Sequence, residues 1–149
     1  MKLIKSSFLI IMILLLSACG MKSVLHEKEF KEFFKDKEYV IMDVDEKVNS
    51  SDVVNAIVSI KDDDSYKIEY YLFKNTTSAK VVYYNNRDAI KESNEGVLKE
   101  ITGKNYEKFS FSNDESFKVV ERVEDTLIFI NTEKKYKNEI ERLLESMGY

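Results

Sequence analysis

The chain has 149 residues, 44% of them hydrophobic, which is enough for one domain with its own core and argues against intrinsic disorder. Its 23 basic and 27 acidic residues give a net charge of −4, so it lacks the basic character that a nucleic-acid-binding surface requires. The same balance provides little attraction to an anionic membrane surface. The chain contains one cysteine, Cys19, which excludes an intrachain disulfide.

The beginning of the chain has the parts of a signal peptide. Lys2 and Lys5 supply a positive start, and an uninterrupted apolar run follows over 8–16. This run is too short to cross the hydrocarbon core of a bilayer as a helix, which takes about 20 residues. It suits the apolar region of a signal peptide, and two small residues then precede Cys19.

Leu16, Ser17, Ala18 and Cys19 resemble the lipobox of bacterial lipoproteins. In that family the cysteine thiol becomes a diacylglyceryl thioether, and a dedicated peptidase cleaves directly before the cysteine. The resemblance implies a lipoprotein signal peptide over 1–18, acyl chains such as palmitate on Cys19, and a lipid-anchored location on the outer face of the cell membrane. Two alternatives stay open, namely an ordinary secretory signal with an incidental cysteine and an anchor that is not cleaved.

Residues 19–26 are predicted to form a short tether between the lipid and the domain. Seven residues after the cysteine reach at most ~25 Å when fully extended, so we expect the domain to lie close to the bilayer. The expected partner is the membrane itself, through the lipid on Cys19, with a membrane protein as a further candidate. No nucleic-acid partner is expected. His26, the only histidine, is interpreted as a solvated residue of the tether.

Residues 27–149 are predicted to form a single α+β domain. In chain order, the pattern predicts a helix over 27–36, a strand over 39–44, a helix over 53–60, a strand over 66–73, a helix after the cap residues 75–78, a loop over 93–104, strands over 106–112, 117–123 and 126–130, and a last helix capped by Asn131 and Thr132. The expected architecture is one mixed or mostly antiparallel sheet of about five strands with helices packed on it. Gly148 is expected to end the last helix in the left-handed conformation.

Two acidic stretches are candidate metal sites. Asp43, Asp45 and Asn49 match the start of a calcium-binding loop, but the sixth and twelfth positions of that loop hold valines where glycine and a bidentate glutamate are required. The three aspartates at 62–64 are interpreted as a solvated turn. We therefore expect no metal and no cofactor.

The sequence contains no motif of a known reaction centre. A nucleophile elbow, a Cys/His pair, a glycine-rich phosphate loop and a His-Glu-x-x-His motif are all missing from it. Hydrolysis by two carboxylates stays open, because residues distant in the chain would leave no local signature. Because the sequence has no motif of a known reaction centre, the chain is not expected to be an enzyme.

The aromatic residues suggest a binding surface. Tyr70 with Tyr71, and Tyr83 with Tyr84, place rings on opposite sides of a strand and of a helix. Tyr71, Phe73 and Tyr84 form a candidate binding face if they are exposed, since aromatic patches mark interaction surfaces. The alternative is that a second layer covers them, because a strand that is apolar on both faces is usually buried on both.

In their Lys-rich composition, residues 27–149 resemble small uncharacterised lipoproteins of low-GC Gram-positive bacteria. This resemblance assigns no functional residue. The expected function is that of a membrane-anchored binding or interaction module that acts outside the cytoplasm and close to the membrane. The alternatives are an enzyme without a recognisable motif, a lipoprotein that binds a small ligand or metal, and a structural or immune-evasion surface protein.

Overall fold

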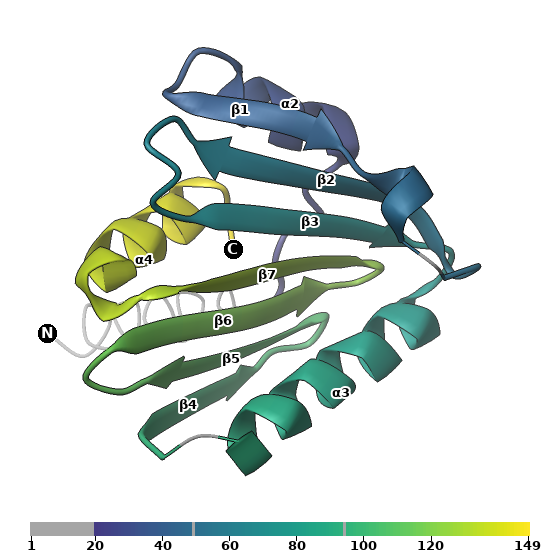
Figure 1. The fold of residues 1–149 in the computed structure, drawn as a ribbon. Coiled ribbons are helices and arrows are strands. Elements are labelled where there is room, and N and C mark those ends of the chain that lie inside the picture. The colour runs from purple at the N-terminus through teal and green to yellow at the C-terminus, as the bar shows by residue number, and fades with distance from the viewer. Residues whose placement is uncertain (1–19, 49, 94) are drawn as a thin grey trace, which may run out of the picture.

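The computed structural model describes residues 20–48, 50–93 and 95–149, which form a seven-stranded sheet with helices on both faces (Figure 1). The α-helices of this part of the chain are α2 (Glu27–Lys35), α3 (Thr76–Ser93) and α4 (Lys137–Ser146). Short 3-10 helices span η1 (Asp45–Lys47) and η2 (Lys134–Tyr136). The strands are β1 (Tyr39–Asp43), β2 (Val53–Lys61), β3 (Lys67–Phe73), β4 (Val97–Thr102), β5 (Tyr106–Ser112), β6 (Ser116–Val123) and β7 (Thr126–Glu133).

The sheet consists of two antiparallel ladders that meet at its centre. Its strand order is β1-β2-β3-β7-β6-β5-β4, and every neighbouring pair is antiparallel. The ladder β1–β3 and the ladder β4–β7 join where β3 pairs with β7. Helix α3 connects the two ladders, carrying the chain from central β3 to β4 at the far edge.

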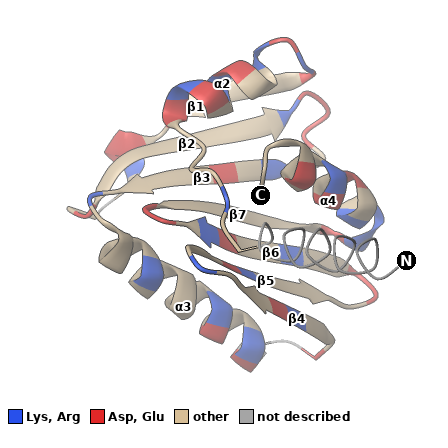
Figure 2. Cartoon of the chain, turned by 180° about the vertical axis from the view of Figure 1, so that it is seen from behind, with Lys and Arg blue, Asp and Glu red and all other residues tan. Residues whose placement is uncertain are grey.

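The two faces of the sheet have different covers. One face packs against α2 and α4, which lie before the sheet in Figure 2, through buried residues that include Phe30, Tyr70, Ile128, Ile140 and Leu144. The opposite face packs against α3, at the lower right of Figure 1, through a second cluster of buried residues that includes Ala79, Tyr83, Phe109, Phe111 and Val120. Apolar positions on both sides of the central strands are therefore covered.

Helix α3 covers only part of its face. Val40 and Met42 of β1, which point to the face opposite α2, are 52% and 38% exposed. Their neighbours on that face, Val58 and Ile60 of β2, are half-buried. The α3 face thus changes from a covered half over β5 and β6 to an open half over β1 and β2.

The expected α+β class and most of the elements are confirmed. The last four strands contain the antiparallel meander β5–β6–β7 at the predicted positions, with turns at Asn113–Glu115 and Glu124–Asp125. Gly148 has a φ of +86°, the left-handed conformation expected behind the last helix.

The predicted number of about five strands is wrong, because the sheet has seven. One added strand is β2, where Val53, Val54, Ile57 and Ile60 predicted a helix. The apolar spacing in β2 reflects burial on two sides, with Ile57 facing α2 and Ala56 facing the α3 side. Its β-branched residues fit a central strand better than a helix.

The second added strand is β4, in the segment predicted as a loop over 93–104. Every residue of β4 is exposed, so its side chains show no alternating apolar pattern, and it is held at the sheet edge by backbone pairing with β5.

The predicted cap of the last helix is also wrong. Asn131 and Thr132 pair with β6 inside β7, and α4 begins only at Lys137.

Candidate functional site

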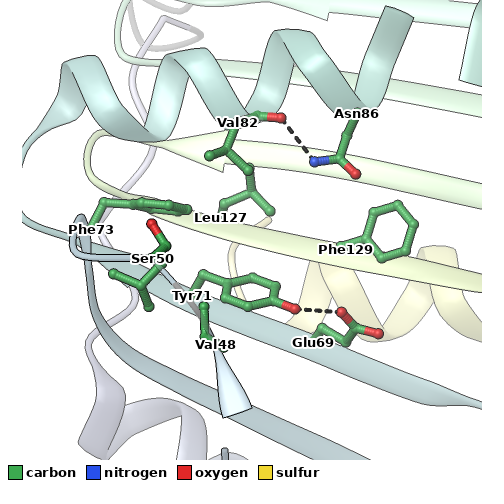
Figure 3. A pocket seen from close by; sticks show the side chains of 10 residues that line it. Val48, Ser50, Glu69, Tyr71, Phe73, Val82, Asn86, Leu127 and Phe129 are labelled. Atoms are coloured by element: carbon green, nitrogen blue, oxygen red, sulfur yellow. Dashed lines mark hydrogen bonds between the residues drawn. The ribbon is translucent and has the colours of Figure 1, made fainter. Parts of the chain in front are cut away.

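A pocket opens where α3 leaves its face of the sheet uncovered (Figure 3). It is lined by residues of the η1–β2 loop, β2, β3, α3 and β7, namely Val48, Ser50, Val53, Glu69, Tyr71, Phe73, Val82, Asn86, Leu127 and Phe129. Its volume is about 310 Å³, at the lower end of the range of ~300–1,000 Å³ typical of small-molecule sites.

The walls of the pocket are mainly apolar and come from elements far apart in the chain. Tyr71 and Phe73 project from the same face of β3, with ring centroids 6.3 Å apart. Leu127 of β7 is the cross-strand partner of Tyr71, and Val82 of α3 forms the opposite wall of the pocket. An apolar group bound here would displace water from aromatic and aliphatic surface on several sides.

A carboxylate with two fixed partners lies at the polar end of the pocket. Glu69 accepts a hydrogen bond of 2.6 Å from the Tyr71 hydroxyl and pairs with the Lys67 ammonium at 2.7 Å. Burial, and then the neighbouring Glu69, raise the pKa of Tyr71, so its hydroxyl remains a donor. The side-chain amide of Asn86 donates to the Val82 carbonyl at 2.9 Å, as Figure 3 shows. The pocket therefore combines an apolar interior with a few oriented polar groups.

The structure brings together two of the three residues of the candidate aromatic face. Tyr71 is half-buried and Phe73 is buried, and both line the pocket. Tyr84 lies elsewhere on α3, 38% exposed, with the guanidinium carbon of Arg87 at 4.6 Å from its ring centroid. The sequence does not identify three further lining residues, Val82, Asn86 and Phe129, as part of a site. The helix and strand that carry them could be predicted, but only the topology places these residues opposite β3.

Three of the candidate metal ligands, Asp43, Asp45 and Asp63, have structural partners, and Asn49 lies outside the described residues. Asp43 pairs with Lys31 at 2.7 Å, and Asp45 accepts the Ala56 amide at 2.5 Å. Asp63 accepts the Ser65 amide in the β2–β3 turn. Within the described ranges, no group of three or more His, Cys, Asp or Glu side chains is arranged to hold a metal ion.

The segment Gly20–Leu25, which we call the docked segment, lies against the sheet on the side of α2 and α4. Lys22 is held by the Asn105 side chain, which accepts the Lys22 amide at 2.9 Å and donates to the Lys22 carbonyl at 2.8 Å. The Tyr70 hydroxyl donates to the Leu25 carbonyl at 2.9 Å. Figure 2 shows the segment crossing the sheet from α2. These residues, predicted to be a tether, are thus bound to the body of the domain.

A buried ion cluster strengthens this docking. The carboxylate of Glu121, in the middle of the sheet, is fully buried and pairs with the ammonium groups of Lys22 and Lys108, the latter at 2.6 Å. The Lys22 ammonium also lies 4.9 Å from the ring centroid of Tyr106. Removing one partner of a buried ion pair destabilises the fold, because it leaves the other charge buried without that partner. The pairing of Lys22 with Glu121 therefore holds the docked segment against the sheet.

Leu16, Ser17, Ala18 and Cys19 lie outside the described residues. Within the described residues, no helix has the length and apolar character needed to cross a membrane. His26 is the first residue before α2, and its backbone amide donates to the Glu29 carboxylate at 2.9 Å.

Comparisons with protein-family models, with curated proteins and with solved structures give no match.

Proposed function

We propose that this chain is a membrane-anchored lipoprotein outside the cytoplasm, whose domain binds a partner close to the membrane. The sequence Leu16-Ser17-Ala18-Cys19 behind an apolar run carries the proposal of lipid anchoring. Two acyl chains suffice for stable anchoring, whereas one is marginal. The pocket beside Tyr71 supports the binding role, because it is the kind of apolar cavity with few polar groups that accepts a small apolar ligand.

The anchor predicts a specific effect of Cys19→Ser. The wild-type protein should incorporate an alkyne-labelled fatty acid and sediment with membranes, because a thioether to diacylglycerol forms only on a thiol. The Cys19→Ser protein should incorporate no label and remain at the length of the precursor. Labelling followed by gel fluorescence and intact mass spectrometry measures both properties.

The matched control is Ser17→Ala, which keeps a small residue before the cysteine and should leave labelling and cleavage unchanged. Equal behaviour of wild type and Cys19→Ser, with both proteins unlabelled, would reject lipid anchoring and favour an ordinary secretory signal.

Filling the pocket provides the test of the binding role. Val82→Trp should place an indole in the cavity and weaken the binding of anilinonaphthalene sulfonate by about tenfold, which corresponds to ~1.4 kcal/mol. The adjacent Val81, 54% exposed on α3, gives the control variant Val81→Trp, which should bind the probe like wild type. Fluorescence titration of the purified proteins measures the dissociation constants. If both variants lost affinity for the probe equally, or if neither lost affinity, the result would contradict a ligand site in this pocket.

A membrane protein is the partner that the anchored position favours. Crosslinking in intact cells and mass spectrometry should capture one membrane protein with wild type, and capture should disappear with Cys19→Ser. Loss of capture with Val82→Trp as well would connect that partner to the pocket.

A further inference from the structure

We infer that the docked segment fixes the orientation of the domain on the bilayer, holding one end of the sheet against the lipid surface. This end, which we call the anchor end, consists of the β4–β5 turn (Gly103–Asn105) and the β6–β7 turn (Glu124–Asp125). The inference rests on the proposed lipid on Cys19 and adds which surface of the domain meets the membrane.

The first step is the position of the chain next to the anchor. The Gly20 carbonyl accepts a hydrogen bond of 2.8 Å from the Lys104 amide, directly on the β4–β5 turn. Cys19 is covalently joined to Gly20, and neighbouring Cα atoms lie ~3.8 Å apart. The acyl chains therefore start within one residue of the body of the domain, with no free linker between them.

The second step is that docking at Lys22 prevents the start of the segment from peeling away. Asn105 binds both backbone polar groups of Lys22, and the buried Glu121 binds its ammonium. Met21, between these contacts and the anchor, is 62% exposed. Its side chain is an apolar group placed where the lipid surface would lie.

The third step is that several turns form one continuous end of the sheet. The Glu124 amide donates to the Asn105 carbonyl at 3.0 Å, which ties the β6–β7 turn to the β4–β5 turn. The Phe73 amide donates to the Asp125 carbonyl at 2.9 Å, which adds the end of β3. Because Phe73 also lines the pocket, the pocket lies near the lipid surface in this orientation.

The opposite end of the sheet lies far from the membrane in this orientation. It carries Asp63 in the β2–β3 turn and Asp114 in the β5–β6 turn, both exposed. Strand β6 has eight residues between the two ends, which is ~25 Å at 3.3 Å per residue. The two turns of the anchor end carry Lys104, Glu124 and Asp125, so the mixed charge gives no strong electrostatic preference and the orientation follows from the anchor.

The experiment measures the depth of each end in vesicles. Full-length protein is purified in lipidated form, after intact mass has confirmed the lipid on Cys19, and carries one fluorophore on a cysteine introduced as Lys74→Cys, Lys104→Cys, Asp63→Cys or Asp114→Cys. It is reconstituted into phosphatidylglycerol and phosphatidylcholine vesicles with headgroup-level nitroxide lipids. Quenching should be about fivefold greater at 74 and 104 than at 63 and 114, because ~25 Å separates the two ends.

A flexible spacer distinguishes the docked orientation from anchoring alone. Ten Gly and Ser residues inserted between Cys19 and Gly20 leave every docking contact in place but give ~33 Å of free reach, so quenching at the two ends should become equal. Asn105→Ala should reduce the difference by releasing Lys22, and Asn138→Ala, at an exposed position of α4, should preserve it.

The outcomes separate the two proposals. An unmodified Cys19 would overturn the anchoring and, with it, the orientation. Lipidated protein with equal quenching at both ends, or with stronger quenching at 63 and 114, would overturn the orientation while leaving the anchoring intact. A fivefold difference that survives the spacer would show that the domain surface, and not the docked segment, sets the orientation, and would equally overturn the inference.

Discussion

Arg122→Met is expected to lower the free energy of unfolding by about 3–5 kcal/mol, since one partner of a buried ion pair is removed. The Arg122 guanidinium is almost completely buried on the α3 side of β6 and pairs with the Glu107 carboxylate on β5. It also donates to the Glu124 carbonyl, so it holds the end of β6 and the following turn together. Without it, the buried Glu107 charge has lost its guanidinium partner.

Urea unfolding followed by circular dichroism measures this effect. The control variant is Arg142→Met on α4, where the exposed guanidinium donates to the Asn138 carbonyl and we expect a change below about 0.5 kcal/mol. The double variant Arg122→Met, Glu107→Leu should recover most of the loss, because no unpaired charge remains in the interior. A double variant as unstable as the single variant would mean that packing, and not charge, explains the cost.

Phe30→Ala should cost about 3–5 kcal/mol, the usual range for removing a fully buried phenylalanine. The Phe30 ring stacks on Tyr70 of β3 with a centroid separation of 4.9 Å and contacts Phe34 at the same separation. Phe30 and Phe34 are the buried residues of the nine-residue helix α2, so the alanine variant removes one of its two buried side chains. Because the docked segment leads directly into α2, we also expect faster amide exchange over 22–35.

Phe33 on the same helix is the matched control. It is half-buried, packs edge-on against Phe34 at 5.0 Å and lies beneath the Lys37 ammonium. Phe33→Ala should therefore cost only about 1 kcal/mol, in proportion to the smaller apolar area that it buries. Thermal unfolding and hydrogen exchange of the two variants provide the comparison, and similar losses at both positions would refute the assignment of Phe30 as the main anchor of α2.

The parts of the fold that were predicted correctly are those with a local signal. The phenylalanines of α2 repeat at helical spacing, and turn residues separate the strands of the β5–β6–β7 meander. Strand β2 was missed because burial on two faces gives an apolar run without a period of two, which periodicity alone does not distinguish from a helix. Strand β4 was missed because an exposed edge strand carries no apolar signal at all.

The candidate site was predictable only on β3. Alternation along that strand places Tyr71 and Phe73 on one face together with Glu69, which the structure confirms. The facing residues Val82 and Phe129 required the strand order, which no local pattern encodes. The docking of Lys22 was equally hidden, because a single asparagine that binds a backbone segment leaves no sequence signature.

The contact between Lys22 and Glu121 also has a consequence for the order of folding. The two residues are 99 positions apart, and a chain is synthesised from its N-terminus. At the usual rate of 5–20 residues per second, Lys22 waits roughly 5–20 s before its carboxylate partner exists. Closing such a long loop is slow and comes late among the native contacts. A nascent chain of this protein therefore has a period in which the strands β1–β3 can pair while the docked segment still lacks its carboxylate partner.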